Sequence, residues 1–471
     1  MGLYLKILCV SILLFFGCKK NQKENYAFLG GKIVNATSRY IVLSKNNTLL
    51  DTVKLDVNNR FNYKINNLKP GFYNFKYAGD MQSVFLEPKD SVTFRLNTLE
   101  FDESLVFTGV GAKKNNYFIN EFLQNEIEEQ RVFKYCQLDA KIFLKRIDSI
   151  KDFKYQKLKT FKTKYPSSVL FNDIAQLHID YNANTRKEIY PFIHYKKQKC
   201  DILKTLPSHF YAHRRTINYN NKAYKNVAIY NRFLRAHINN LALEKHMTRG
   251  HDVHFNRTSL SFSLDKLELI DRLIRLPNVK NKLLFNTTFS FLNNNNDANN
   301  QKVLLQSFYA KATNKDNIAS IKALHLKLEG LRSGKKFPNT TLLNYSGDTV
   351  FIDAVITQPT AVYFWSIKHK NHFIKSHIKA RELKSKYPEI NFLAINIDQK
   401  DNKEWLKMLK ESSLPLDNEY IMKDARTGLK PLSIYPMSKV FLLDKKGIII
   451  SSHPNMLTTN FEEQILGFVS R

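Results

Sequence analysis

Cysteine is scarce in this chain. Four cysteines occur among its 471 residues, at Cys9, Cys18, Cys136 and Cys200, and no two of them form a Cys-x-x-Cys pair. The neighbouring thiols that carry out disulfide exchange in such a motif are therefore absent. Thiol chemistry would have to come from cysteines that lie far apart in the sequence.

Acidic residues are also few relative to basic ones. The chain has 73 Lys and Arg against 42 Asp and Glu, for a formal net charge of +31, and its isoelectric point is near 9.7. A charge of this size is typical of proteins that bind nucleic acid. Here the excess is mostly Lys spread among Asn, Ile and Phe, without an Arg-rich arm or an aromatic RNA-binding signature. We therefore expect no nucleic-acid partner, and attraction to anionic lipid head groups explains the charge better.

The N-terminus lacks a hydrophobic run long enough to cross a membrane as a stable helix. Ile7 to Gly17 is apolar but shorter than the ~20 residues that a spanning helix needs. The run ends in Phe15-Phe16-Gly17-Cys18, which resembles a lipobox, where a small residue precedes a cysteine that is lipidated and becomes the new N-terminus. An ordinary cleaved signal and an uncleaved anchor are the alternatives. All three place the rest of the chain outside the cytoplasm.

We therefore predict a lipoprotein signal peptide over residues 1–17, lipidation of Cys18 and a polar tether over residues 18–26. The predicted location is the cell envelope of a Gram-negative bacterium, periplasmic or at the outer membrane, with the membrane as a partner through the lipid anchor. Only Cys136 and Cys200 then remain as thiols. They could form a disulfide in an oxidising compartment, but two buried free thiols fit the sequence equally well.

The first part of the mature chain has the pattern of short strands. A chain of this length suits roughly two to four domains. From Phe28 to about Val110, short alternating segments are separated by turns at Asn58-Asn59, Pro70-Gly71 and Gly79-Asp80. This spacing is typical of an antiparallel β-sandwich. We predict an all-β sandwich domain over residues 27–112.

The apolar period then becomes helical. Phe118, Phe122 and Ile127 fall near one face of a first helix, and later segments repeat the pattern. We predict a helical domain over residues 113–327 that packs the other two domains together.

A strand, a short loop and a helix follow one another near residue 365. Ala361 to Trp365 is an apolar run, a polar turn follows it, and Phe373 to Lys386 is an amphipathic helix. Two further segments continue the pattern, a buried strand over Ile390–Asp398 and a hairpin over Val440–Ile450. This order predicts an α/β domain over residues 328–471.

The strand–loop–helix unit resembles the active-site corner of the TlpA/ResA type of membrane-anchored thioredoxin-like proteins. Their pattern is an apolar strand, then F-W-A-T-W-C-x-x-C, then a helix. Phe364 and Trp365 match the start of this motif, but His369 and His372 stand in place of the two redox cysteines. The resemblance implies a thioredoxin-like fold for the C-terminal domain and, for an active family member, disulfide reductase activity.

The N-terminal strands resemble the β-sandwich domain that often precedes TlpA-like domains in lipoproteins. Four short segments carry this resemblance in order and spacing: Phe28–Ile33, Pro70–Tyr73, Pro88–Val92 and Phe107–Ala112. The predicted fold class is therefore multidomain, with a β-sandwich, a helical middle and a C-terminal α/β thioredoxin-like domain.

The redox site that the resemblance implies is degenerate. In an active member the first cysteine lies at a helix N-terminus, where the dipole lowers its pKa, and the second resolves the mixed disulfide. Imidazoles at His369 and His372 cannot form a disulfide. The family also has a cis-proline facing the cysteines, at a position that Ser438 occupies here, with Pro436 two residues earlier. We therefore expect no enzymatic disulfide exchange and no cofactor.

The leading hypothesis is a binding module without redox activity. A groove around Trp365, His369, His372 and Tyr435 would hold an extended peptide or a partner protein of the envelope. A structural envelope protein, in which the N-terminal domains carry the interaction, is an alternative.

Two further hypotheses involve chemistry. A metal site could use His369, His372 and His377, although their spacings do not put three imidazoles on one helical face. Residual thiol-disulfide activity would need Cys136 or Cys200 to lie in the groove.

Overall fold

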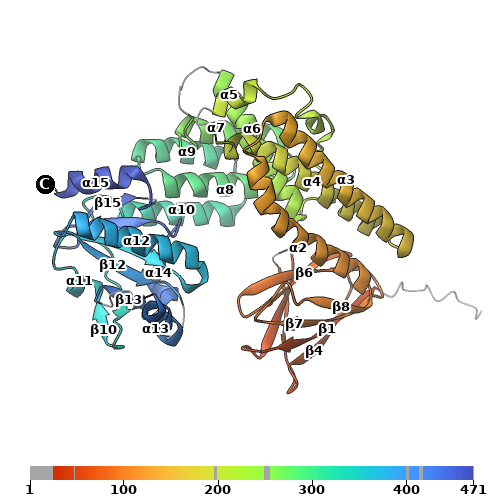
Figure 1. Ribbon diagram of the computed structural model, residues 1–471, viewed down its shortest axis with the longest axis horizontal. Helices are drawn as coiled ribbons and strands as arrows, with labels where there is room; N and C mark the ends of the chain where they lie inside the picture. The colour runs from red at the N-terminus through yellow and green to blue at the C-terminus, as the bar shows by residue number, and fades with distance from the viewer. Residues whose placement is uncertain are drawn as a thin grey trace, which may run out of the picture. The chain divides into compact units, whose positions relative to one another are not determined.

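The computed structural model of the chain describes residues 25–46, 48–195, 199–248, 255–398, 402–412, 417–453 and 455–469 (Figure 1). The predicted signal peptide, the lipidation site at Cys18 and nearly all of the predicted tether lie outside these residues. None of the helices within them is long and apolar enough to cross a membrane. The described residues fold as two compact units: one contains those up to Ile217 together with Asn226–Asn240, and the other contains Asn218–Lys225 and those from Leu241 onward.

The first unit begins with two four-stranded sheets. Their strand orders are β4-β1-β7-β8 and β3-β2-β5-β6, and β1 and β7 pair in parallel while the other neighbours are antiparallel. The strands are β1 (Tyr26–Val34), β2 (Tyr40–Lys45), β3 (Thr48–Lys54), β4 (Arg60–Asn66), β5 (Gly71–Tyr77), β6 (Asp80–Leu86), β7 (Ser91–Asn97) and β8 (Val106–Val110). Burial alternates along β7, where Val92, Phe94 and Leu96 are buried and the residues between them are exposed. Each strand of this kind therefore has one core face and one solvent face.

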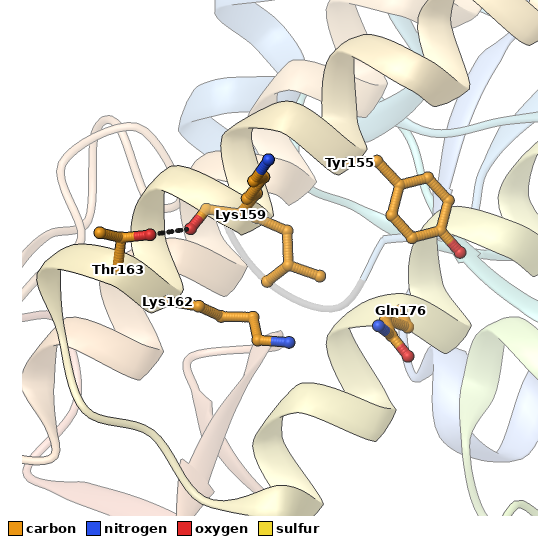
Figure 2. Close-up of a pocket in the computed structure, with 6 residues that line it drawn as sticks. Tyr155, Lys159, Lys162, Thr163 and Gln176 are labelled. Carbon is orange, nitrogen blue, oxygen red and sulfur yellow. Dashed lines mark hydrogen bonds between the residues drawn. The ribbon is translucent and has the colours of Figure 1, made fainter.

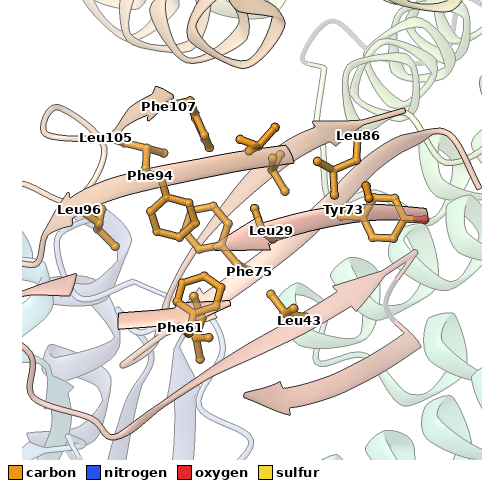
Figure 3. Packing of buried hydrophobic residues seen from close by; sticks show 14 of the residues in the cluster. Leu29, Leu43, Phe61, Tyr73, Phe75, Leu86, Phe94, Leu96, Leu105 and Phe107 are labelled. Atoms are coloured by element: carbon orange, nitrogen blue, oxygen red, sulfur yellow. The ribbon is translucent and has the colours of Figure 1, made fainter. Parts of the chain in front are cut away.

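Phe94 lies at the centre of an aromatic group in the core of these two sheets (Figure 3). Its ring stacks on that of Phe75, with the centroids 4.5 Å apart and an interplanar angle of 20°. Phe61 and Phe107 meet it edge to face at 5.6 and 5.8 Å. Such pairs add about 0.5–1.5 kcal/mol each beyond the burial of apolar area. Because Phe75 is on β5 and Phe94 on β7, the stacked pair joins the two sheets.

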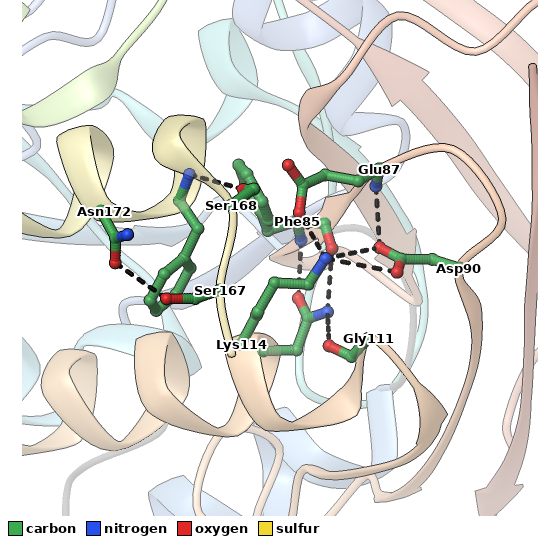
Figure 4. Close-up of polar contacts among 10 residues, drawn as sticks. Phe85, Glu87, Asp90, Gly111, Lys114, Ser167, Ser168 and Asn172 are labelled. Carbon is green, nitrogen blue, oxygen red and sulfur yellow. Dashed lines mark hydrogen bonds and ion pairs between the residues drawn. The ribbon is translucent and has the colours of Figure 1, made fainter. Parts of the chain in front are cut away.

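A glycine and a lysine attach helix α2 (Ala112–Tyr135) to the sandwich. Gly111 precedes the helix with φ +92°, and a Cβ there would lie 2.5 Å from the Asp90 carboxyl carbon. A larger residue at this position would therefore be strained in both backbone and side chain. Lys114, in the first turn of α2, pairs with the Asp90 carboxylate at 3.1 Å and with Glu87 (Figure 4). The ion pairs hold the start of the helix against the end of β6 and the turn before β7.

Long helices make up the rest of the first unit. They are α3 (Ala140–Lys164), α4 (Val169–Ile193) and the first part of α6 (Ala228–Thr248), with the short α5 (Lys199–Lys204) and the 3-10 helix η2 (Ala212–Thr216) between them. The Asp139 and Ser168 side chains cap α3 and α4 by accepting hydrogen bonds from first-turn amides. Lys154 on α3 is buried and bridges Glu121 and Glu128 of α2 at 3.0 and 3.3 Å.

Glu188 on α4 is the centre of another buried polar cluster in this unit. Its Oε1 lies 2.9 Å from Nε2 of His213 and 2.8 Å from Nδ1 of His237, and its Oε2 accepts from Arg214 at 2.6 Å. Burial opposes ionisation of Glu188, but the hydrogen bonds from these three side chains outweigh it and lower its pKa. Because His213 and Arg214 are on η2 and His237 is on α6, the carboxylate ties three elements together.

The second unit contains further helices, α7 (Leu260–Leu273), α8 (Pro277–Asn294), α9 (Ala298–Lys311) and α10 (Lys315–Gly330). Ser259, Asp297 and Asn314 cap α7, α9 and α10. The helices that the sequence predicts as one middle domain thus divide between the two units. One reason is that α10 leads directly into Leu331 and Phe337, which are buried in a core of the C-terminal sheet.

A seven-stranded sheet forms the C-terminal part of the second unit, in the order β10-β9-β13-β12-β11-β14-β15. Strands β11, β12 and β13 are parallel, β14 runs antiparallel beside β11, and β15 runs antiparallel beside β14. The strands are β9 (Thr341–Leu343), β10 (Thr349–Phe351), β11 (Thr360–Trp365), β12 (Asn391–Asn396), β13 (Glu419–Met422), β14 (Val440–Leu443) and β15 (Ile449–His453).

Helices cover both faces of this sheet. One core contains residues of α12 (Lys370–Lys386), α13 (Asn402–Glu411) and α15 (Thr459–Val469), and the other contains residues of α11 (Ile352–Val355) and α14 (Ala425–Leu432). Alternate residues of β11 enter the two cores, so all six of its residues are buried. A β-α-β unit followed by an antiparallel hairpin and a closing helix is the thioredoxin-like arrangement. The predicted fold is therefore confirmed for this part of the chain.

Candidate site at the start of helix α12

Asp398 holds the turn between β11 and α12. Its Oδ1 accepts a hydrogen bond from Ser366 Oγ at 2.6 Å, and its Oδ2 accepts one from the Ile367 amide at 2.7 Å. Ser366 Oγ in turn accepts from the Lys368 amide at 3.2 Å. Asp398 follows the end of β12, which pairs in parallel with β11, and the carboxyl ends of parallel strands meet at one edge of a sheet. The turn that precedes His369 is therefore fixed from the neighbouring strand.

His369 and His372 lie in different environments. His369 is exposed and is the N-cap residue of α12, where its side chain makes no capping hydrogen bond. His372 is half-buried, and its Nε2 lies 3.2 Å from Ser376 Oγ. Burial lowers the pKa of His372, and the nearby His369 and His377 lower it further. A neutral imidazole at His372 avoids the unfavourable interaction of a cation with a helix N-terminus.

His377 is not available for a ligand. Its Nδ1 lies 2.8 Å from the Phe373 carbonyl oxygen and its Nε2 lies 2.9 Å from Oε1 of Glu419, and the imidazole is buried. Both ring nitrogens therefore have protein partners. Within the described residues, no group of three or more His, Cys, Asp or Glu side chains is arranged to hold a metal ion. The geometry gives no support to a metal site that uses His369, His372 and His377.

Trp365 is part of the same buried group and does not line a groove. Its side chain is fully buried, and its Nε1 donates a hydrogen bond to Oε2 of Glu419 at 3.2 Å. Its ring lies 4.6 Å from that of Phe373 between centroids. The predicted groove position of Trp365 is thus corrected, because β11 is covered by helices on both of its faces.

The hydrogen-bond partners of Glu419 and His377 determine where the pair carries its protons. A carbonyl oxygen only accepts, so His377 Nδ1 carries a hydrogen. The contact between Nε2 and the carboxyl group then needs one more proton, located on either atom. In both arrangements the pair as a whole is neutral, which suits its burial. Burial also raises the pKa of Tyr363 well above its ordinary value.

The cis peptide bond before β14 joins Tyr435 and Pro436, two residues before Ser438. The sequence analysis matched the family's cis-proline position to Ser438, and the cis bond found in this loop precedes Pro436. Because Val440 of β14 pairs with Tyr363 of β11, this loop lies at the sheet end where β11 leads into the turn before α12. Tyr435 is 51% exposed, and its ring meets that of Phe289 edge to face at 5.2 Å. Of the predicted groove residues, Tyr435 and His369 are exposed.

Cys136 lies in an apolar core of the first unit. It is a fully buried free thiol, packed in a cluster with Phe143 and Tyr190. Burial raises its pKa to about 12, so it is not a thiolate at neutral pH. The side chain of Cys200 lies outside the described residues. Cys136 therefore gives no support to thiol chemistry in this chain.

The site contains residues that the sequence analysis did not single out. Asp398 was predicted only as the end of a strand, and Glu419 was not assigned to any element. An acidic residue at the carboxyl end of the strand beside β11 was a usable signal for Asp398. Glu419 gave no such signal, because it lies 42 residues from His377 in the sequence.

Comparisons with known proteins concern the C-terminal part of the chain. No family model and no curated protein matches the sequence. Several solved structures that are similar to about 30% of the chain bear names of thiol-disulfide oxidoreductases, isomerases or interchange proteins. A putative thiol:disulfide interchange protein DsbE from Chlorobium tepidum is 21% identical, with 29% of this chain and 97% of that chain covered and a TM-score of 0.26. A domain of a possible thiol-disulfide isomerase from Cytophaga hutchinsonii is 23% identical, with coverages of 30% and 95% and a TM-score of 0.27. The C-terminal domain of a putative thiol-disulfide oxidoreductase from Bacteroides thetaiotaomicron is 25% identical, with coverages of 30% and 97% and a TM-score of 0.25.

Proposed function

We propose that this chain is an envelope-anchored thioredoxin-like protein that binds a peptide or partner protein and does not catalyse thiol-disulfide exchange. The observation that carries the proposal is the identity of two residues in the turn between β11 and α12. His369 and His372 stand there at the two positions where redox-active relatives have cysteines.

The chemistry of imidazole explains the loss of redox activity. Disulfide exchange needs a thiolate that attacks a disulfide sulfur and a second thiol that resolves the mixed disulfide. Neither His369 nor His372 can form a sulfur–sulfur bond. The buried thiol of Cys136, whose pKa is about 12, is a poor replacement.

The ordered turn before α12 supports a binding role. The hydrogen bonds of Asp398 to Ser366 and to the Ile367 amide fix this turn, although there is no thiolate to position. Exposed side chains remain next to it, including His369 and Tyr435. On α12, Ile374 and Ile378 are exposed one turn apart, and side chains at this spacing share one face of a helix. Aromatic and apolar side chains on a rigid framework suit the side chains of an extended peptide.

Anchoring is supported by the N-terminal sequence alone. The apolar run over Ile7–Gly17 ends at Cys18, and the net charge of +31 favours contact with anionic head groups. The proposed place of action is therefore the envelope of a Gram-negative bacterium, with the C-terminal unit on the side away from the cytoplasm.

The absence of disulfide exchange is tested by the reduction of insulin with the full chain purified in detergent. We expect the wild-type protein to match the uncatalysed rate with dithiothreitol. The His369→Cys/His372→Cys variant restores the Cys-x-x-Cys spacing and should form a disulfide between the two new thiols and accelerate the reaction. The two single variants are the matched controls, because each has one thiol without a resolving partner. A wild-type rate equal to that of the double variant would show that exchange proceeds by another route.

Binding is tested by photocrosslinking in intact cells. A benzophenone amino acid replaces Tyr435, and the same substitution at Tyr345 provides the control. Both tyrosines belong to the second unit and are about half exposed, at 51% and 48%. We expect one specific adduct from position 435 and none of that mass from position 345. Equal adducts from both positions, or none from position 435, would remove the proposed binding role from this site.

A further inference from the structure

A cavity of about 370 Å³ lies within the second unit, between the helical segment that ends near residue 333 and the hairpin of β14 and β15. Small-molecule sites in proteins usually have roughly 300–1,000 Å³. Its wall is partly apolar, with Leu328, Leu331 and Ile450, and partly polar, with Asn296, Ser333 and Ser452. The size and the mixed wall suit a small organic molecule better than a bare ion.

Lys439 lines this cavity and is 4% exposed. Within the part of the chain that the structure describes, its ammonium group has no hydrogen bond or ion pair. The nearest specific partner is the ring of Phe441, whose centroid lies 5.1 Å from Nζ. A lysine this deeply buried normally has a carboxylate or several acceptors beside it. Lys439 therefore presents a cation that no hydrogen-bond or ion-pair partner compensates among the described residues.

Charge around the cavity has one sign. Among the described residues that line it, Lys439 and Arg332 are basic and none is acidic. Arg332 is partly neutralised, because it pairs with Glu329 at 2.8 Å and donates to Gln301 Oε1 at 3.1 Å. Lys439 has no such ion-pair partner within the described ranges. An anionic group in the cavity would supply the missing one.

The wall of the cavity is held in place by hydrogen bonds between different elements. Asn296, in the loop before α9, donates to the carbonyl oxygen of Ser452 on β15 at 2.8 Å. Gln301 on α9 donates to the carbonyl oxygen of Asn295 at 2.6 Å, while its Oε1 accepts from Arg332. Hydrogen bonds therefore link the polar residues on this side of the cavity to one another.

A second hollow on the surface provides a useful contrast (Figure 2). It has about 310 Å³ and lies in the first unit between α3 and α4, with Lys159 and Lys162 in its wall. Both lysines are exposed, so water already solvates their charges. Tyr155 in the same wall donates its hydroxyl hydrogen to Asp180 at 2.8 Å. This hollow lacks the buried, unpaired cation that distinguishes the cavity at Lys439.

We infer that the cavity at Lys439 and Arg332 binds a small organic anion, whose phosphate or carboxylate group pairs with Lys439 and whose apolar part lies against Leu328, Leu331 and Ile450. The inference does not depend on the proposed function, because none of these residues belongs to the turn at His369. It assigns a ligand site to the junction between the helices and the sheet of the second unit.

The test is isothermal titration of the full chain with three probes that share one ring: phenyl phosphate, benzoate and neutral benzyl alcohol. We expect one or both anions to bind and the alcohol not to bind, and the comparison of the two anions identifies the preferred oxyanion. The Lys439→Met variant keeps the length of the side chain without its charge and should weaken anion binding at least about tenfold. Lys445→Met is the matched control, because Lys445 is an exposed lysine of the neighbouring turn, and should bind like the wild type.

A measurement on the wild-type protein makes the test independent of the variants. Burial lowers the pKa of Lys439 to about 8, and a bound anion favours the ammonium form, so binding near pH 8 should take up protons. The uptake appears as a dependence of the binding enthalpy on the ionisation enthalpy of the buffer. Failure of both anions to bind, equal binding of benzyl alcohol, or unchanged binding to Lys439→Met would each overturn the inference.

Discussion

Oε1 of Glu419 lies 2.9 Å from Nε2 of His377, and both side chains are buried in the core of the C-terminal sheet. The other oxygen of Glu419 accepts the indole hydrogen of Trp365. One carboxyl group on β13 thus satisfies side chains from β11 and α12. His377 belongs to α12, the helix that begins after His369 and carries His372 in its first turn.

Two variants of Glu419 should behave differently. Glu419→Leu leaves Trp365 Nε1 and His377 Nε2 without partners, so it should lower the free energy of unfolding by roughly 2–4 kcal/mol. Glu419→Gln can accept from Trp365 and donate to His377, so we expect a loss of about 1 kcal/mol or less. Urea unfolding of the full chain measures both values. If the two variants were equally unstable, the hydrogen bonds would not be the reason for the loss.

Removal of the Asp398 carboxylate should loosen the turn before α12. Asp398→Ala eliminates the acceptors of Ser366 Oγ and of the Ile367 amide, and we expect the Ile367 amide to exchange with solvent about tenfold faster or more. Asp444→Ala is the matched control, because Asp444 accepts from the Lys446 and Ile448 amides in the hairpin turn. Hydrogen exchange read by mass spectrometry should show no change at Ile367 in that control. Unchanged exchange in Asp398→Ala would show that the turn is held by other contacts.

The stability of the first unit should fall on acidification because of the Glu188 cluster. Hydrogen bonds lower the pKa of Glu188 in the folded state, so its stabilising contribution is present above the unfolded pKa and is lost as the pH falls toward the folded pKa. Burial lowers the pKa of His213, so protonation below its ordinary pKa of 6.5 favours unfolding as well. Both effects have the same sign. Denaturant unfolding of the wild-type protein should give a lower free energy of unfolding at pH 4 than at pH 7, and a stability that did not change between these pH values would contradict this account.

Lys439 should destabilise the protein when the cavity has no ligand. Its folded-state pKa is lowered from 10.5 to about 8, so the charged form is penalised in full below pH 8 and the penalty disappears as the pH rises to about 10.5. Lys439→Met should therefore raise the free energy of unfolding at pH 7 by roughly 1–3 kcal/mol. The gain should shrink at pH 10. A variant that is less stable than the wild type at pH 7 would show that the ammonium group already has a partner.

Lipidation predicts a change of location on substitution of Cys18. Cys18→Ser removes the only thiol in the predicted lipobox, so the protein should leave the membrane fraction and lose metabolic labelling with a fatty acid. Cys9→Ser, inside the predicted signal peptide, is the control and should leave both properties unchanged. Acyl labelling that persists in Cys18→Ser would place the lipid elsewhere.

The thioredoxin-like fold was predictable because its signals are local. The apolar run at β11, the amphipathic segment of α12 and the hairpin of β14 and β15 each fall within a few residues of the predicted bounds. Strand β13 was not predicted, because it has four residues and contains a glutamate that burial would ordinarily exclude. That glutamate is stable there only through Trp365 and His377, which come from other elements.

The site was less predictable than the fold, because its contacts also come from elements that are distant in the sequence. The sequence placed His369 and His372 at the start of α12, where the structure has them. It placed Trp365 in a groove, because an aromatic residue next to a motif gives no information on how many layers cover it. The position of the cis bond at Pro436 depends on how the loop enters β14, which the pairing of Val440 with Tyr363 determines.

Leu331 and Phe337 are buried among residues of β11 and β14. Their burial determines where the C-terminal domain can be cut out of the chain without damage to its core. The chain after α10 also runs along the last hairpin, where the Gly334 amide donates to the Ile449 carbonyl oxygen at 2.8 Å. A fragment that starts at residue 328 would keep these contacts but lose α7–α9 and most of α10, which belong to the same unit. It would open the wall at Asn296 and Gln301 and expose one side of the hairpin. The sheet and helices α7–α10 therefore form one exchangeable unit, and a gene fusion or truncation that keeps only the sheet and its covering helices would break it.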